Sequence, residues 1–453
     1  MRFALLALLF LQAGSATNPH DQLVRDILKE LIEINTTDTP AGSTTRAAEA
    51  MAARLKAAGF TVEDVAVLGP TPTKGNLVAR LRGTGEKKPI LLLAHIDVVE
   101  ARREDWSTDP FKLIEQDGFF YGRGTSDDKG QAAIWMATLI RFKQEGFTPN
   151  RDLILALTAD EEGGDHNGVQ WLLKEHRNLI DAEFALNEGG GGELKDGKRV
   201  LNSVQASEKI YQSYKLEVKN PGGHSSRPVP DNAIYQLADG LGRLAKFQFP
   251  VRFSEVTSSY FTKMADLTPG AVAADMRAAL KKDPRAIARL SAGAYENALM
   301  RTTCVATRLD GGHADNALPQ VARATVNCRV LPGESENEVK ATLVRVLSNP
   351  KIEVSAIDEF VTGDASPLRP EVMGPILKVT AEMWPGIPVV PVMSTGATDG
   401  LFLRNAGIPT YGLSGIFSDV DDDRMHGKDE RIGVKALSEG RDFLYRVVKA
   451  YGS

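Results

Sequence analysis

The chain has 453 residues, of which 25% are charged and 42% are hydrophobic, and its formal net charge is -5. This length exceeds that of one ordinary domain, so we expect two domains. The small acidic excess gives no basis for nucleic acid or an anionic membrane surface as a partner. No stretch approaches the roughly 20 apolar residues that cross a bilayer, so the composition favours a globular protein that acts on small molecules.

The first residues have the pattern of a secretory signal. Arg2 supplies one positive charge, residues 4–13 are mostly apolar, and Gly14 and Ala16 are the small residues expected before a cleavage site. A buried N-terminal helix is the alternative. We expect residues 1–16 to be removed and the mature protein to be exported, either to the periplasm or out of the cell, with no membrane association after cleavage.

The next part of the chain alternates predicted helices with short apolar strands. The runs Ile90–Ala94 and Leu153–Leu157 are apolar without alternation, which indicates strands that are covered on both faces. The pattern predicts a helix-covered, mostly parallel or mixed sheet. The predicted helices are 21–34, 44–58 and 130–145, and the further predicted strands are 61–67 and 76–81.

The pattern changes after about residue 207. Ile210–Val218 alternates apolar and polar residues, as a strand with one solvent-exposed face does. A helix over 231–244, two strands around Pro319 and a helix over 335–347 follow, and together they form an α+β unit. The predicted fold is therefore α/β, with a catalytic domain (17–207 and 364–453) interrupted by an inserted lid domain (208–363) that carries a helical insertion over about 250–300.

Cys304 and Cys328 are the only cysteines. Both lie in β-like runs, 302–307 and 324–330, which are separated by a turn region rich in Gly, Asn and Pro. Two antiparallel strands would let the thiols face each other, so a disulfide is one interpretation in an exported protein. Two small buried hydrophobic side chains are the other.

Two polar motifs stand where strands end. His95-Ile96-Asp97 directly follows the Ile90–Ala94 strand, and Asp97 suits the carboxylate that fixes the orientation of a metal-bound imidazole. Asp127 follows a Gly-rich turn and precedes a helix. A carboxylate in such a place can bridge two cations.

Further acids and a second histidine extend this set. Glu161 and Glu162 follow the Leu153–Leu157 strand. Adjacent side chains point in different directions, so we expect one to bind metal and the other to act as general base. Glu188 and His426 add another carboxylate and imidazole. Two histidines and three carboxylates, with one glutamate left free, are the ligands of a di-zinc site.

The ordered motifs H-I-D, Y-G-R-G-x-x-D-D-K-G, D-E-E, N-E-G and M-H-G resemble those of the zinc peptidase and aminoacylase family. That family includes carboxypeptidase S, glutamate carboxypeptidase, aminoacylase, and the desuccinylase and deacetylases of amino-acid biosynthesis. The resemblance covers nearly the whole mature chain. It is strongest toward carboxypeptidase S and its secreted N-acyl-amino-acid hydrolase relatives, through H-I-D-V-V, D-W-S-T-D-P-F and D-G-F-F-Y-G-R-G. A scatter of structural acids is the competing interpretation.

The resemblance implies two Zn²⁺ ions as cofactors, with other divalent ions such as Co²⁺ as substitutes. It also implies a role for each residue of the set: the first metal is bound by His95 and Glu188, the second by Glu162 and His426, Asp127 bridges the two, Glu161 is the base and proton shuttle, and Asp97 orients His95.

The resemblance extends to the lid. N-P-G-G-H-S matches the motif whose histidine, here His224, stabilises the tetrahedral oxyanion, although a cap on a Gly-rich turn is the alternative role. Asn316 and Arg329 match positions that hold the carboxylate of the substrate. Arg329 is equally compatible with a salt-bridged surface residue.

S-T-G-A-T-D matches a loop on the substrate side of the site, where the backbone at Gly396 can approach a ligand closely. The chain departs from several relatives two residues after this motif. They carry an arginine where this chain has Leu401, and Arg404 is only a weak substitute.

These features predict an exported di-zinc hydrolase that removes a C-terminal amino acid from peptides or N-acyl amino acids, by attack of a metal-bridging hydroxide. The alternatives are a dipeptidase or aminopeptidase of the same family, and a binding homologue without catalysis. A glutamate at position 188 accompanies carboxypeptidase and acylase activity in the family. Relatives also imply a homodimer through the lid, although the extra helices of the insertion could obstruct or replace that interface. Whether His224 acts within its own chain or across to a second one stays open.

Overall fold

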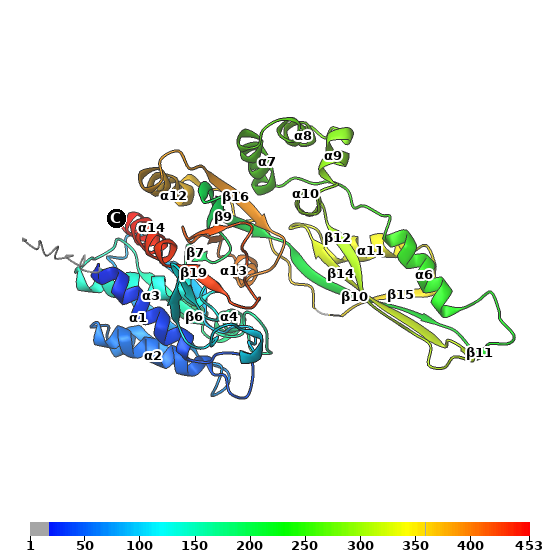
Figure 1. Cartoon of the computed structure of the whole chain (residues 1–453), viewed down its shortest axis with the longest axis horizontal. Coiled ribbons are helices and arrows are strands. Elements are labelled where there is room, and N and C mark those ends of the chain that lie inside the picture. The colour runs from blue at the N-terminus through cyan, green and yellow to red at the C-terminus, as the bar shows by residue number, and fades with distance from the viewer. Residues whose placement is uncertain (1–17, 358) are drawn as a thin grey trace, which may run out of the picture.

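The structure is a computed structural model that describes residues 18–357 and 359–453, so the signal predicted over 1–16 lies outside the described residues. Two regions are visible in Figure 1: a large sheet surrounded by helices, and an elongated second unit that projects from it. The large sheet has ten strands of mixed direction. The predicted α/β class, with a mixed catalytic sheet and an inserted α+β unit, is confirmed.

The large sheet owes its centre to three buried parallel strands. β3 (Ile90–His95) lies between β6 (Leu153–Thr158) and β7 (Phe184–Asn187), and both of these neighbours run parallel to it. The carboxyl ends of all three therefore meet at one edge of the sheet. The other strands are β1 (Val65–Leu68), β2 (Asn76–Leu81), β8 (Gly192–Lys195), β9 (Lys198–Glu208), β16 (Val389–Ser394), β17 (Thr410–Gly412) and β18 (Phe417–Asp419).

Helices cover both faces of this sheet, which explains the unbroken apolar runs. Leu92 packs into the large cluster on one face, whereas Leu91 and Leu93 pack into a separate cluster on the other. Among the described residues, every helix is too short or too polar to cross a membrane. The helices of this region are α1 (Pro19–Glu33), α2 (Thr44–Ala57), α3 (Lys129–Gln144), α4 (Gly168–Glu175), α5 (Arg177–Ile180), α12 (Pro370–Met383), α13 (Gly400–Asn405) and α14 (Val434–Tyr451).

The predicted strand over 61–67 is wrong in its first half. Residues Val62–Asp64 form a 3-10 turn, and the strand begins only at Val65. The hydroxyl of Thr61 contacts the carboxylate of Asp64 at 3.1 Å, which closes this turn. Short polar side chains compete with the strand backbone in this way.

The lid has a four-stranded antiparallel sheet in the order β12 (Thr303–Gly311), β14 (Val321–Val330), β10 (Ile210–Lys219) and β15 (Ile352–Ala356). Helices α6 (Ala233–Leu244) and α11 (Glu336–Leu347) pack with it around a core of its own. A short ribbon of β11 (Gly223–His224) and β13 (Ala317–Leu318) extends it. A single residue, Lys209, joins β9 of the catalytic region to β10 of the lid.

The helical insertion comprises α7 (Glu255–Leu267), α8 (Ala271–Leu280), α9 (Pro284–Leu290) and α10 (Ala294–Met300). Its buried side chains, among them Val256 and Phe261, belong to the large core of the catalytic region and not to the lid core. Although these helices are inserted within the sequence of the lid, they extend the other region (Figure 1).

The two cysteines form a disulfide. Cys304 on β12 lies directly opposite Cys328 on β14, and the two sulfurs are bonded. Of the two interpretations that the sequence allowed, the structure has the cross-strand disulfide. It fastens an edge strand of the lid to its neighbour.

Candidate metal centre

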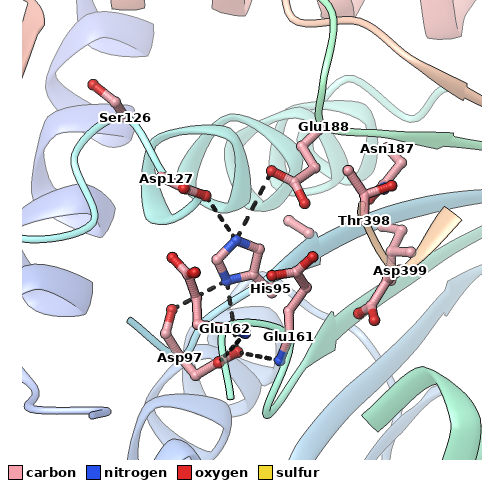
Figure 2. Close-up of polar contacts among 12 residues, drawn as sticks. His95, Asp97, Ser126, Asp127, Glu161, Glu162, Asn187, Glu188, Thr398 and Asp399 are labelled. Carbon is pink, nitrogen blue, oxygen red and sulfur yellow. Dashed lines mark hydrogen bonds and ion pairs between the residues drawn. The ribbon is translucent and has the colours of Figure 1, made fainter. Parts of the chain in front are cut away.

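The candidate residues gather at the edge where the central parallel strands end. His95 is the last residue of β3 and pairs in register with Thr158 at the end of β6. Glu161 and Glu162 follow β6, and Glu188 directly follows β7. Figure 2 shows these side chains converging from three neighbouring strands. The topology alone thus brings together residues that are almost 100 positions apart.

Asp127 lies between the two candidate histidines. One of its carboxylate oxygens, Oδ1, is 2.9 Å from His95 Nε2, and the other, Oδ2, is 3.1 Å from His426 Nε2. Asp127 is in the loop before α3, whereas His426 is in the loop between β18 and β19 (Arg431–Gly433) and has a φ of 60°. A carboxylate with one oxygen toward each imidazole has the geometry of a bridging ligand.

Asp97 has two contacts to the cluster. Its backbone carbonyl lies 3.1 Å from His95 Nδ1, and its carboxylate oxygen Oδ1 lies 3.6 Å from the same nitrogen. Its carboxylate also accepts hydrogen bonds from the backbone N–H groups of Glu161, at 3.2 Å, and Glu162, at 3.0 Å. Asp97 therefore fixes the ring of His95 and also the turn that carries the two glutamates, a second contact that its motif did not indicate.

The two adjacent glutamates point to different sides of His95 (Figure 2). Glu162 lies 2.9 Å from His426 Nε2 and shares a possible ligand group with His95 and Asp127. Glu161 shares another such group with His95 and Glu188, with potential ligand atoms within 4.8 Å of one another. The pair is thus divided in space. The roles of base and ligand stay predictions.

The electrostatics of the cluster call for added positive charge. Burial raises the pKa of Glu161 to about 9 and that of Glu162 to about 7, and it raises the pKa of Glu188 well above its usual range. Burial opposes the charge of His95, but its contacts to Asp127 and Asp97 raise the pKa of the imidazole overall. Divalent cations would balance these buried carboxylates, and oxygen and imidazole donors in this number suit zinc.

Two of the lid candidates lie side by side but away from this cluster. His224 pairs with Ala317 in the β11–β13 ribbon, and the N–H of Ser225 donates to the carbonyl of Asn316 at 3.0 Å. The imidazole of His224 is exposed and accepts a hydrogen bond from the N–H of Ser226 at 3.1 Å. Figure 1 places the ribbon at the far end of the lid.

Arg329 lies near the opposite end of the lid sheet. It pairs with Tyr211, at the start of β10, whereas the ribbon follows the end of β10 at Lys219. The two ends, Tyr211 and Lys219, are eight residue steps apart along the strand, a span of about 26 Å. The guanidinium of Arg329 lies 4.8 Å from the ring centre of Tyr211, and no carboxylate of the described residues pairs with it. The three lid candidates therefore do not form one site within a single chain.

The Gly-rich loop follows β16. Gly396 is exposed there, and its N–H donates to the hydroxyl of Ser394 at 3.0 Å. Leu401, which stands where several relatives have arginine, is buried against the lid core. Arg404, which the sequence offered only as a weak substitute, is buried in an ion pair with Glu208 and is not available to a ligand.

A cleft of about 1330 Å³ opens beside the cluster, with Asp127 and Glu188 in its wall. Another part of the wall is apolar. There the rings of Trp384 and Phe417 pack edge to face, with their ring centres 4.7 Å apart. The apolar lining residues include Met383, Trp384, Pro385, Ile387, Ile416 and Phe417. Trp384 and Phe417 are each 5% exposed, and the guanidinium of Arg199 lies over both of their rings.

The motifs gave no role to three buried residues near the cluster. Asp399 accepts a hydrogen bond from Asn167 Nδ2 at 2.6 Å, and burial raises its pKa to about 7. The loop between β16 and α13 carries Asp399 to the end of β6, where it contacts the hydroxyl of Thr158, and only its place in the S-T-G-A-T-D motif was a signal. Arg123 and Glu430 form a buried ion pair at 2.7 Å beside Asp127. Only weak signals for this pair were present in the sequence: Arg123 is a single charge between two glycines, and Glu430 is an acid shortly after His426.

Comparison with known proteins agrees with this geometry. Residues 91–450 match the model of peptidase family M20/M25/M40. The human N-fatty-acyl-amino acid synthase/hydrolase PM20D1 is 29% identical over 372 residues, which cover 80% of this chain and 74% of that protein. The probable carboxypeptidase S-like 2 of Dictyostelium discoideum is 29% identical over 388 residues, 83% of this chain and 74% of that protein.

Solved structures share the fold. The M20 family metallo-carboxypeptidase Sso-CP2 from Sulfolobus solfataricus has a TM-score of 0.72 at 18% identity, covering 95% of this chain and 99% of its own. Human carnosine dipeptidase 1 has a TM-score of 0.64 at 16% identity, covering 96% and 97%. The family predicted from the motifs is confirmed: the chain belongs to peptidase family M20/M25/M40, and it is a hydrolase of the metallopeptidase and aminoacylase type.

Proposed function

We propose that this hydrolase carries two zinc ions and releases the C-terminal amino acid from N-acyl amino acids or peptides. The observation that carries the proposal is the Asp127 carboxylate, held between His95 and His426 with one oxygen toward each. Glu188 lies beside His95 and Glu162 lies beside His426, so the five side chains form a row with Asp127 at its centre. Bound cations would polarise the amide carbonyl and acidify the attacking water.

Glu161 is the proposed proton carrier. Its backbone is fixed by Asp97, so its carboxylate is held beside the row of ligands. It takes a proton from the attacking water and delivers it to the leaving nitrogen. Burial raises the pKa of this side chain, and bound cations would lower it again, so that the free carboxylate can accept the proton.

Turnover on a panel of N-acyl amino acids and peptides tests the function. A chelator should abolish hydrolysis and added Zn²⁺ should restore it. Glu161→Ala should lower kcat by about 10²–10⁴-fold, as the loss of a general base does. Unchanged hydrolysis in this variant would remove Glu161 from the mechanism, and hydrolysis only of substrates with a free amine and a blocked carboxyl end would favour an aminopeptidase.

The apolar wall of the cleft supports a substrate with an apolar acyl group. The relative PM20D1 is named for N-fatty-acyl amino acids. In this chain the wall around Trp384, Ile387 and Phe417 belongs to the same cleft as Asp127. An acyl chain that starts at the cluster would lie against this wall. Each buried methylene contributes about 0.8 kcal/mol, or about fourfold in kcat/KM.

A series of N-acyl amino acids of increasing acyl length measures this preference. The value of kcat/KM should rise with chain length in the wild type. Ile387→Asp should flatten the rise and leave N-acetyl substrates unaffected. A wild-type kcat/KM that does not depend on acyl length would contradict the assignment of the wall.

A second copy of the chain is the proposed source of the missing lid contacts. His224 and Arg329 lie at opposite ends of the lid sheet, so an antiparallel pairing of two lids brings His224 of one copy toward the Arg329 end of the other. The outer edge of β12 supports this pairing, because Val305 and Leu309 are 61% and 69% exposed there. Uncovered apolar edge strands are unusual in monomers.

The mass of the protein in solution tests the pairing. The wild type should sediment as a dimer and Leu309→Lys as a monomer, because a charge in the paired edge opposes association. Val62→Lys, a matched change at an exposed apolar residue of the catalytic region, should stay dimeric. A monomeric wild type would contradict the proposal.

Export is also proposed. The signal pattern at residues 1–16 and the Cys304–Cys328 disulfide support it, since disulfides persist in oxidising compartments. Mass spectrometry of the protein from its native host should find a mature chain without residues 1–16. An intact N-terminus on a cytoplasmic protein would contradict it.

A further inference from the structure

Glu430 is a buried carboxylate that collects four hydrogen bonds beside the candidate metal centre. Its side chain is 1% exposed. Oε1 accepts from the backbone N–H groups of Ser126, at 2.8 Å, and Asp127, at 3.1 Å. Oε2 accepts from the guanidinium of Arg123, at 2.7 Å, and from the N–H of Gly124, at 2.9 Å. The backbone of the proposed bridging residue is thus fixed to a charge that is distant in sequence.

The partner in this ion pair reaches the other side of the centre. Arg123 is 2% exposed, and its Nη2 donates to the backbone carbonyls of Gly427, at 2.9 Å, and His426, at 3.3 Å. The guanidinium also lies 5.1 Å from the ring centre of Trp106. One buried ion pair therefore holds the main chain of Asp127 and the main chain of His426 together.

The candidate ligands differ in what supports them. His95 and Glu188 stand at the ends of buried strands in the centre of the sheet. His426 stands in a loop, its side chain is 56% exposed, and its backbone has a positive φ. The orientation of the strand-end ligands follows from the sheet, whereas that of His426 depends on the contacts made to its loop.

We infer that the Arg123–Glu430 pair is a positioning element that sets the affinity of the second cation site, the one formed by Glu162 and His426 with Asp127. The inference rests on the proposed two-metal function and adds to it a pair of residues that position the ligands of one metal. Loss of a group that orients metal ligands typically lowers metal affinity by about 10–100-fold. When the pair is disrupted, the metal affinity of the first site, formed by His95 and Glu188 with Asp127, should fall much less.

Zinc titration of the mature full-length protein, first stripped with a chelator, tests this inference without any substrate. The wild type should bind two equivalents tightly. Glu430→Gln should bind the first equivalent as the wild type does and the second about 10–100-fold more weakly. Arg123→Lys keeps the charge but not the fork that reaches both Glu430 and the carbonyls, so it should weaken the same equivalent. When Co²⁺ replaces Zn²⁺, the visible absorption that the second equivalent adds should differ between these variants and the wild type, whereas that of the first equivalent should be the same.

Arg441→Lys is the matched control. Arg441 is also buried and ion-paired, with Asp21, but it lies between α14 and α1. Its titration should match the wild type. Thermal unfolding of the metal-free variants checks that each one is folded. If Glu430→Gln does not fold, the titration of Arg123→Lys tests the inference in its place.

Two results would overturn the inference: both equivalents bind to the variants as they do to the wild type, or both weaken by the same factor, which indicates a general loosening of the fold. A wild type that binds fewer than two equivalents would overturn the proposed two-metal function itself. This last result is seen in the wild type alone, so the two failures are distinguishable.

Discussion

The catalytic region and the lid distribute their candidate residues in opposite ways. In the catalytic region, His95, the Glu161–Glu162 pair and Glu188 meet at one edge, because neighbouring parallel strands end together. In the lid, His224 and Arg329 lie on one antiparallel sheet, yet they are at opposite ends of it. Parallel strands gather functional groups, whereas long antiparallel strands spread them. The proposed site therefore requires the two regions to meet.

The largest expected effect separates the two adjacent glutamates of the catalytic region. Glu161→Gln should lower kcat by about 10²–10⁴-fold and retain two zinc ions, because only the proton carrier is lost. Glu162→Gln should retain one zinc ion, because a ligand of the second site is lost. Metal analysis of the dialysed proteins beside kcat measures both. Equal zinc content in the two variants would show that the glutamates do not divide as proposed.

The second prediction asks whether the lid completes the site of another copy. His224→Ala should lower kcat by about 10²–10³-fold with its metal retained, as the loss of an oxyanion donor does. Mixing it with Glu161→Ala, after dissociation and reassociation, should restore about one quarter of wild-type activity, because each mixed dimer then has one intact site. No recovery would place His224 in its own chain.

The third prediction concerns the separate cores of the two regions. Replacing both Cys304 and Cys328 with serine should lower the free energy of unfolding of the lid by about 2–4 kcal/mol. Hydrogen exchange should rise in β12 and β14 and stay unchanged in β3 and β6. Equal increases in both sheets would mean that the regions unfold as one unit.

The fourth prediction concerns the junction of the two regions. Burial lowers the pKa of Lys209 to about 7. Between this value and the usual pKa of lysine, the unfolded chain binds more protons than the folded one, so stability rises with pH. The gain should be at most about 1.4 kcal/mol per pH unit. Lys209→Met should lack this rise, which chemical denaturation from about pH 7 to about pH 10 would measure. Parallel curves for the two proteins would contradict it.

The strand ends of the catalytic region could be predicted because their signals are local. An unbroken apolar run followed by His95, or by Glu161 and Glu162, fixes both the strand and the edge at which it ends. The partners of other side chains are distant in sequence. Arg404 is taken up by Glu208, which lies 196 positions away, and no local pattern contains that pair.

The helical insertion shows the same limit at the level of domains. The amphipathic pattern of its helices predicts that their apolar faces pack against a hydrophobic core. Their position in the sequence suggests the core of the lid. Tyr260 and Phe261 instead join the core of the catalytic region. The choice between two neighbouring cores depends on shape, and composition does not encode shape.

The shortest of the links between the two regions is a single residue. Lys209 joins the two sheets, and its ammonium group donates to the carbonyl of Arg301, where the chain returns from the insertion. Arg329 lies close to this pivot, whereas His224 lies beyond the far end of β10. A turn of about 10° at the pivot moves the far end of such a strand by about 5 Å and the near end by very little. A rotation at this link would therefore change the reach of His224 while the guanidinium of Arg329 stayed almost in place.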